Sequence, residues 1–329
     1  MKVSVVLALY NGEKFLADQV RSILAQSHGD LELLIMDDAS TDESWRLAGE
    51  FAREDGRVRL YRNAANEGIV KNFLKGISLA AGDAVCLSDQ DDVWRKDKIE
   101  LLANLLDKRP DNMLAYSDLD ICDAHMRSEG LSFWNEAGIK PRQGRLGERA
   151  LLRNIVPGCS MMFRRRVRDA VAETSADPEF MSLNVAERLD HTPFMHDHLA
   201  FFVGAMTGRV VYTREKLVRY RQHSRNSIGA FYSPLSDKEE LRRLLDRKIE
   251  MVKHIRLDNG SADVDRLEQF RDCLSGAGFF LRQSFLPYFL YRRNDTLRDK
   301  AMGLLECCSP AAYEKLRGAL SRAEASASS

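Results

Sequence analysis

The first 115 residues of this 329-residue chain alternate between two hydrophobic periodicities. Continuous apolar runs, typical of strands covered on both faces, are each followed by apolar residues at the spacing of an amphipathic helix. The runs predicted to be strands are Val3–Leu9, Leu31–Met36, Val58–Tyr61 and Ala84–Ser88, and the last predicted helix lies near Lys98–Leu106. This alternation constrains the fold more than any other feature, because it predicts an α/β domain with a Rossmann-like, doubly wound, mostly parallel sheet.

The pattern changes twice after this segment. Further strands are predicted at Met113–Tyr116, Ser160–Phe163 and Arg209–Tyr212, with a helix around Asp197–Ala205. From Ser236 onward the pattern is helical, and Ser236 with Glu239 forms a predicted capping box. We therefore predict an α/β domain over residues 1–233, a helical C-terminal region over 234–320 and a small, polar, disordered tail over 321–329.

Composition excludes some classes of function. Lys plus Arg and Asp plus Glu both number 49, so no overall basic charge favours nucleic acid. The six cysteines form no CxxC pair and lie mostly in apolar runs, which predicts buried free thiols in a reducing compartment. The N-terminal apolar run is too short for a signal peptide, and no apolar stretch approaches the ~20 residues of a membrane span. A cytoplasmic protein, peripheral to the membrane at most, is expected.

Residues 278–293 are rich in aromatic side chains and end in Arg292-Arg293. An amphipathic segment resting on the inner, anionic face of a membrane has this composition. A core helix broken at Pro287 or a contact between subunits of a homo-oligomer has it too. The sequence leaves the three interpretations open.

Polar residues gather where the predicted parallel strands end. Tyr10-Asn11, Asp37-Asp38 and Asp89–Asp92 each follow an apolar strand, and Asn66 precedes the third helix. Ligands of open parallel sheets bind beyond the carboxyl ends of the strands. The placement therefore predicts a binding site at this edge.

Asp89-Gln90-Asp91-Asp92 is the most informative of these segments. Three carboxylates within four residues repel one another unless a positive charge lies among them, and Mg²⁺ or a similar cation takes one or two carboxylates plus substrate phosphates. The alternative is a solvated acidic turn in which Asp92 caps the next helix.

Two weaker segments accompany this turn. The Asp38 carboxylate is expected to contact a nucleotide, while Ser40 and Glu43 form a predicted capping box for the second helix. Glycine after Asn66 permits a phosphate or sugar to approach the start of the helix that carries Lys71. Taken alone, Asn and Gly are ordinary turn residues.

Together these segments resemble the family 2 glycosyltransferases, which share the GT-A fold. The resemblance covers about residues 1–233 and rests on these motifs: Leu9-Tyr10-Asn11-Gly12, Asp37-Asp38-Ala39-Ser40-Thr41-Asp42, Asn66-Glu67-Gly68 with Asn72, and Asp89-Gln90-Asp91-Asp92. The family usually has Gly where this chain has Ala39, which is a departure from its pattern.

The resemblance implies roles for individual residues. The residues implied in donor binding are Ala8, Tyr10, Asn11, Asp38, Asn66, Lys71, Asp89 and Arg221. Asp91 and Asp89 match the family's DxD motif, so a divalent ion (Mg²⁺ or Mn²⁺) is expected on them, with His223 as a further ligand. Arg221 and His223 match a segment that closes over the diphosphate. Packing at the sheet edge is the alternative for Tyr10, and a structural role is the alternative for His223.

Asp197 lies where the family places its catalytic carboxylate. A general base there would remove the acceptor's proton while the hydroxyl attacks the anomeric carbon opposite the diphosphate, and a single displacement inverts the anomeric configuration. The alternative is that Asp197 caps the helix that follows. His196 and His198 point about 100° from it on a helix, so we do not predict a zinc site.

Three segments resemble the rhamnosyltransferase branch of the family. They are Ser88-Asp89-Gln90-Asp91-Asp92-Val93-Trp94, Tyr116-Ser117-Asp118 and Tyr220-Arg221-Gln222-His223. That branch uses dTDP-L-rhamnose to build bacterial surface polysaccharides such as O-antigen. The resemblance thus implies a nucleotide-sugar donor and a saccharide or lipid-linked saccharide acceptor, and this step is analogy. A UDP-hexose transferase, a nucleotidyltransferase and a non-catalytic nucleotide-sugar-binding subunit are the rivals.

Overall fold

The computed structural model describes residues 1–147, 149–152, 154–185, 192–223, 246–257 and 260–261. Within these ranges, the residues up to 223 and those from 250 onward belong to one compact unit. Most of the predicted helical region 234–320, including the Ser236 capping box, lies outside the described residues, as do residues 278–293 and the tail. Those predictions, and the domain boundaries, therefore remain predictions.

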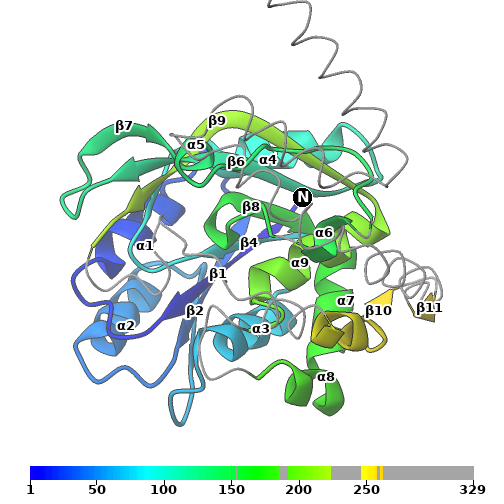
Figure 1. The fold of residues 1–329 in the computed structure, drawn as a ribbon. Coiled ribbons are helices and arrows are strands. Elements are labelled where there is room, and N and C mark those ends of the chain that lie inside the picture. The colour runs from blue at the N-terminus through cyan, green and yellow to red at the C-terminus, as the bar shows by residue number, and fades with distance from the viewer. Residues whose placement is uncertain (148, 153, 186–191, 224–245, 258–259, 262–329) are drawn as a thin grey trace, which may run out of the picture. The chain divides into compact units, whose positions relative to one another are not determined.

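A mixed sheet runs through the unit with strand order β3-β2-β1-β4-β8-β6-β9-β5, and β7 pairs with β6 (Figure 1). The strands are β1 (Val3–Leu9), β2 (Leu31–Asp37), β3 (Val58–Arg62), β4 (Ala84–Ser88), β5 (Val93–Trp94), β6 (Asn112–Cys122), β7 (Ser128–Ser132), β8 (Met161–Arg164) and β9 (Arg209–Arg221). β1 to β4 are parallel to one another, and β6 is parallel to β9. β8 is antiparallel to both β4 and β6. The predicted α/β class and the parallel first half are confirmed.

Helices connect the parallel strands and cover the sheet. They are α1 (Leu16–Leu24), α2 (Ser44–Glu54), α3 (Ile69–Leu79), α4 (Lys98–Asp107), α5 (Phe133–Glu136), α6 (Arg149–Leu152), α7 (Arg165–Ser175), α8 (Pro178–Leu183), α9 (His196–Thr207) and a 3₁₀ turn, η1 (Gly158–Ser160). A short ribbon, β10 (Arg256–Leu257) with β11 (Gly260–Ser261), completes the described elements. α3 contacts β1 and β2, and α7 contacts α3, α9 and β4.

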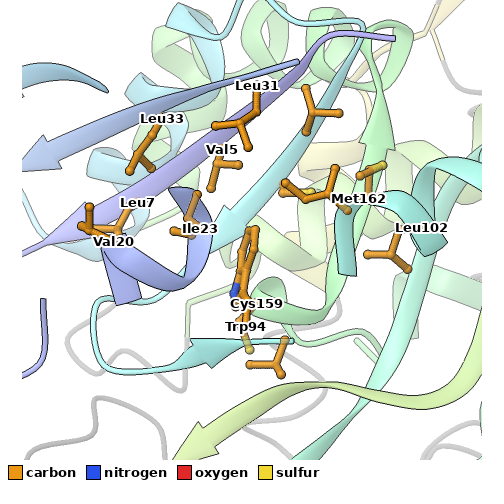
Figure 2. Close-up of a cluster of buried hydrophobic side chains, with 14 of the residues drawn as sticks. Val5, Leu7, Val20, Ile23, Leu31, Leu33, Trp94, Leu102, Cys159 and Met162 are labelled. Carbon is orange, nitrogen blue, oxygen red and sulfur yellow. The ribbon is translucent and has the colours of Figure 1, made fainter. Parts of the chain in front are cut away.

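One face of the sheet carries a continuous apolar cluster (Figure 2). Val5 and Leu7 of β1 meet Val20 and Ile23 of α1 there, and Trp94 extends the cluster toward α4. β1 is buried along nearly its whole length, because helices cover both of its faces. This double coverage explains why the strand reads as an unbroken apolar run.

Cys86, Cys122 and Cys159 are buried free thiols, as predicted for them, and the other three cysteines lie outside the described residues. Among the described residues, no helix has the length and apolar character that a membrane span requires.

Two strands are much longer than predicted. β6 continues to Cys122 and β9 continues to Arg221, beyond the apolar runs that ended at Tyr116 and Tyr212. The polar residues of β6 are satisfied by tertiary partners: the Asp118 carboxylate accepts hydrogen bonds from the backbone N–H of Trp134 and from the Ser132 hydroxyl. Hydrophobic periodicity cannot show such partners, because they come from another part of the chain.

The predicted capping box at Ser40 and Glu43 is wrong. α2 begins at Ser44, and its N-cap residue, Glu43, makes no side-chain cap. The Ser40 hydroxyl instead accepts a hydrogen bond from the backbone N–H of Asn11 at 3.0 Å. Ser40 therefore joins two loops at the sheet edge, and Asp42 accepts from the N–H of Ser44.

Candidate functional site

The loops that follow β1, β2 and β4 meet at the carboxyl edge of the parallel strands. Register places Leu9 opposite Asp37 and Leu7 opposite Ser88, so the residues after these strands become neighbours. The N–H of Asp38 donates to the carbonyl of Leu9 at 2.8 Å. Most of the predicted site residues are brought to this edge, and Ala8, near the end of β1, is partly exposed there.

The turn after β1 is held by Gln90, from the middle of the acidic segment. The Gln90 side chain accepts from the N–H of Tyr10 at 2.8 Å and donates to its carbonyl at 3.1 Å. A Cβ on Gly12 would lie 2.4 Å from the Gln90 oxygen, so a larger residue there would displace the Gln90 side chain from its hydrogen bonds to Tyr10. The Tyr10 side chain is 45% exposed and open to a ligand. The Asn11 side-chain oxygen accepts from the N–H of Thr41, which places Asn11 in the scaffold of the site.

Asp38 is buried and fully engaged by the loop after β3. Its carboxylate accepts from the side-chain amide of Asn63 at 2.8 Å and from the backbone N–H groups of Glu67 at 2.8 Å and Gly68 at 2.9 Å. The side-chain oxygen of Asn66 accepts from the same Gly68 N–H at 3.1 Å. Asp38 therefore fixes the loop that leads to α3, where Lys71 is exposed.

Ala39 has a left-handed backbone, with φ of 60°. A residue with a Cβ is disfavoured there and glycine is not. Ala39, where the family usually has Gly, therefore occupies a position whose backbone conformation favours glycine.

The Asp89–Asp92 turn follows β4 and brings several carboxylates together. Ligand atoms of Asp89, Asp92 and Cys159 lie within 4.8 Å of one another. Burial, and then repulsion from Asp91, raise the pKa of the Asp89 carboxyl to about 7. The same two causes raise the pKa of the Asp92 carboxyl well above its ordinary value. The turn therefore concentrates negative charge where water is scarce.

His223 comes from the end of β9 and faces Asp91. Its Nε2 lies 2.9 Å from the Asp91 Oδ2, and its ring stacks on Phe15 with centroids 4.6 Å apart. Arg221, two residues earlier, is buried and also lies over the Phe15 ring. Its guanidinium donates to the carbonyls of Asp91 and Ala124 and to the Asp18 carboxylate. Arg221 thus ties β9 to the acidic turn.

Two separate sets of atoms here can be compared with the needs of a hard divalent cation: the pair Asp91 and His223, and the group Asp89, Asp92 and Cys159, which does not include that pair. Neighbouring ligands of an octahedral Mg²⁺ lie about 3 Å apart, because each is about 2.1 Å from the ion. The 2.9 Å between Asp91 and His223 matches that spacing as well as a hydrogen bond. The Asp92 Oδ2 is buried and has no hydrogen-bond partner among the described residues, which is a further unsatisfied negative atom beside Asp89.

Asp197 lies in the first turn of α9 but is not its cap. The helix begins at His196 and its N-cap residue is Met195. The Asp197 carboxylate accepts from the N–H of His198 at 2.7 Å, and the nearby Gly158 backbone and Asn154 side chain act to lower its pKa. Burial raises the pKa of this carboxyl to about 6, and its charge in turn raises the pKa of Asp89. Asp197 is therefore close to the acidic turn.

The two histidines beside Asp197 are engaged in the core. His196 stacks on Phe73 at 3.9 Å, and burial lowers its pKa to about 3, so the ring is neutral. A His198 ring nitrogen lies 2.8 Å from the carbonyl of Ala150. These contacts direct the two rings to different parts of the core.

Four residues that shape this site were not predicted from the sequence: Phe15, Gln90, Cys159 and the buried Lys98, whose Nζ donates a hydrogen bond to the carbonyl of Cys159 at 2.6 Å. Gln90 stands between the predicted metal carboxylates, so its position was a usable signal. Phe15, Lys98 and Cys159 read as ordinary helix and core residues, because their partners lie far away in the chain.

Comparison with known proteins agrees with this geometry. The family model described as "Glycosyl transferase family 2" matches residues 4–171, which is 168 of the 329 residues. The chain belongs to glycosyl transferase family 2. The predicted family is thus confirmed.

Several curated relatives of this family 2 chain carry glycosyltransferase names. The dTDP-rhamnosyl transferase RfbG of Shigella flexneri is 27% identical over 239 residues, covering 68% of this chain and 74% of RfbG. The putative glycosyltransferase EpsE of Bacillus subtilis is 36% identical over 108 residues, covering 32% of this chain and 39% of EpsE. The first four curated relatives are matched over only 15% to 39% of their own lengths.

Solved structures show the same fold. S. aureus TarS 1–349 in complex with UDP-GlcNAc has a TM-score of 0.56 and 16% identity, over 93% of this chain and 80% of TarS 1–349. The same protein with UDP has a TM-score of 0.55 and 15% identity, with the same coverage. These likenesses confirm the GT-A type of α/β fold in this family 2 chain.

Proposed function

We propose that this protein transfers a sugar from a nucleotide diphosphate donor to an acceptor hydroxyl, with inversion at the anomeric carbon and with a divalent cation. The observation that carries the proposal is the acidic turn Asp89–Asp92, which faces His223 on one side and lies close to Asp197 on another. A cation site beside a buried carboxylate of raised pKa is what an inverting transfer needs.

The chemistry assigns Asp197 as the general base. The acceptor oxygen attacks the anomeric carbon, its proton passes to the Asp197 carboxylate, and the bond from that carbon to the diphosphate oxygen breaks with its electron pair on the leaving group. A pKa of about 6 leaves Asp197 ionised at neutral pH yet basic enough to accept the proton. A bound Mg²⁺ or Mn²⁺ would supply positive charge beside the leaving diphosphate, held by Asp91, Asp89 and His223.

The donor's nucleoside is assigned to the edge formed by Ala8, Tyr10 and Asn11. The exposed Tyr10 ring supplies a flat surface for a base. Asp38 shapes this pocket through the loop that it holds, and the exposed Asn66 and Lys71 are placed to meet the donor's polar groups. Arg221 supports the diphosphate site by holding the acidic turn.

Among donors we propose dTDP-L-rhamnose, because RfbG aligns over 68% of this chain. A saccharide or lipid-linked saccharide acceptor of a bacterial surface polysaccharide such as O-antigen, and a cytoplasmic location beside the membrane, follow from the same analogy. A UDP-hexose is the alternative donor, since the TarS structures contain UDP and UDP-GlcNAc.

Calorimetry with dTDP and UDP, each with and without Mn²⁺, tests the function. We expect binding that requires the metal, and slow metal-dependent hydrolysis of at least one nucleotide sugar from a panel of dTDP and UDP donors. Binding without metal dependence, or no binding, contradicts the proposal and favours a non-catalytic subunit.

Asp197→Asn separates chemistry from binding. We expect hydrolysis and transfer to fall by roughly 10² or more while the dissociation constant of the nucleotide stays within a few-fold, because a general base contributes about 10²–10⁴ to the rate. Asp107→Asn, at an exposed carboxylate of α4, is the matched control. Near-normal turnover of Asp197→Asn would refute its role.

A further inference from the structure

Lys98, the first residue of α4, is completely buried. Lysine is almost never fully buried unless its charge has partners, because an unpaired ammonium loses several kcal/mol of solvation. Among the described residues no carboxylate forms a direct ion pair with Lys98. The fold must therefore retain this ammonium through other contacts.

The Lys98 ammonium lies between two turns of the site. Its Nζ donates a 2.6 Å hydrogen bond to the carbonyl of Cys159 and lies 3.2 Å from the centroid of the Trp94 ring. Trp94 and Cys159 both belong to the buried cluster (Figure 2). The charges of Asp89 and Asp92 also act on the ammonium, so the acidic turn lies near it.

The carbonyl that Lys98 holds belongs to the 3₁₀ turn Gly158–Ser160, and this turn contacts the proposed base. The Gly158 backbone lies near the Asp197 carboxylate and lowers its pKa, against the larger effect of burial, which raises it. A Cβ on Gly158 would lie 3.3 Å from the Asp197 Cβ and 3.4 Å from His196 Nε2, so the turn packs tightly on the start of α9. The contacts thus run from Lys98 through one short turn to Asp197.

We propose that Lys98 is a positioning residue that fixes the separation between the cation-binding turn and the base. It does so by anchoring the Gly158–Ser160 turn to the segment Asp89–Lys98. The inference rests on the proposed function, because it assigns Lys98 an effect on that same reaction.

The Lys98 ammonium also offsets negative charge on the acidic turn. Asp89, Asp91 and Asp92 carry three negative charges when ionised, and a divalent cation neutralises two of them. Lys98 supplies a positive charge from the protein side, where solvent cannot reach. A neutral side chain of the same shape would leave the turn with excess negative charge and the Cys159 carbonyl without its donor.

Lys98→Met and Lys98→Gln separate these contributions. Methionine keeps the apolar stem, one atom shorter than lysine, without charge or donor, whereas glutamine keeps a donor that can reach toward the Cys159 carbonyl. We expect the rate of metal-dependent donor hydrolysis, per nucleotide-binding site counted by calorimetry, to fall by about thirtyfold in Lys98→Met and by less in Lys98→Gln. The dissociation constant of the Mn²⁺–nucleotide diphosphate complex should change less than about threefold.

A double-mutant cycle then shows whether Lys98 acts through the base. In an Asp197→Asn background, Lys98→Met should lower the remaining rate by less than about twofold, because the group that it positions is already gone. Lys96→Met, on the exposed neighbouring lysine, is the matched control and should leave rate and affinity unchanged.

Two results would overturn the inference. One is an unchanged rate per binding site in Lys98→Met or, if that variant does not fold, in Lys98→Gln, since a purely structural lysine would lower only the number of folded molecules. The other is an equal penalty with and without Asp197. A wild-type protein that neither binds nucleotide with Mn²⁺ nor hydrolyses any donor would instead refute the proposed function.

Discussion

The two strands that flank β1, β2 and β4, each end in an acidic turn. The two turns differ in how many hydrogen bonds their carboxylates accept. After β2, the buried Asp38 carboxylate accepts hydrogen bonds from Asn63, Glu67 and Gly68. After β4, Asp89 and Asp92 lie close together with Cys159, and one oxygen of Asp92 has no partner among the described residues.

The difference lies in the supply of donors. The loop 63–68 wraps the first turn with N–H groups, which stabilise the charge of Asp38 without any ligand. In the second turn the Asp92 Oδ1 accepts one long hydrogen bond, from the Arg221 N–H at 3.3 Å, and its Oδ2 has no partner among the described residues. Burial and repulsion raise the pKa values of Asp89 and Asp92 there. A carboxylate with hydrogen-bond donors stabilises the fold, whereas a cluster of carboxylates with too few donors is stabilised by binding a cation.

Asp91→Asn should produce the largest effect on the second turn. We expect turnover to fall by roughly 10³ or more and Mn²⁺-dependent nucleotide binding to be lost, because the variant removes a charged ligand. Thermal unfolding without metal should change little or shift upward, since repulsion within the turn falls. Retained metal dependence in Asp91→Asn would break the comparison, and Asp107→Asn again serves as the control.

The pH dependence should follow Asp197 and the second turn. The pKa of Asp197 is raised from 3.8 to about 6, so the base is progressively protonated as pH falls through 6 and the rate should fall about tenfold per pH unit below that value. The acidic limb of the pH–rate profile should thus begin about two pH units above the limb expected for an ordinary aspartate. Nucleotide binding measured at each pH distinguishes this loss from weaker metal binding. A rate that is flat down to pH 4.5 would contradict the assignment.

Asp38→Asn should instead act on stability. Asparagine places an NH₂ group against the N–H donors of Glu67 or Gly68, so we expect about 1.5–3 kcal/mol to be lost from the free energy of unfolding. Metal dependence of the remaining nucleotide binding should persist. Urea unfolding measures the loss, and Asp97→Asn, at a half-exposed ion pair with Arg95, should change it by less than about 1 kcal/mol. If Asp38→Asn kept its stability but its nucleotide binding no longer depended on metal, the roles assigned to the two turns would be reversed.

Ala39→Gly should give the smallest effect. Ala39 has a φ of 60°, where glycine carries no steric penalty, so the substitution should stabilise the fold by about 0.5–1 kcal/mol. Ala52→Gly, in the last turn of α2, where the backbone is right-handed, should instead destabilise the fold. Equal signs for the two variants would show that the left-handed conformation of Ala39 is not strained.

Local pattern determined the parallel half of the fold. β1 and β4 have the predicted bounds, and β2, β3 and α4 each end one residue later than predicted, because strands and helices buried by their immediate chain neighbours carry clear periodicity. β6 and β9 were predicted too short. Their polar residues are satisfied by distant partners such as Ser132 and Trp134, which periodicity cannot reveal.

The sequence by itself determined which residues lie at the carboxyl edge of the sheet, since strand direction places Tyr10, Asp38 and Asp89–Asp92 there. Only the tertiary structure decided what each carboxylate does. Hydrogen-bond donors for Asp38, the ring of His223 beside Asp91 and the buried ammonium of Lys98 near Asp89 come from segments remote in the chain. Charge and protonation depend on distances between groups, and those distances exist only once the chain is folded.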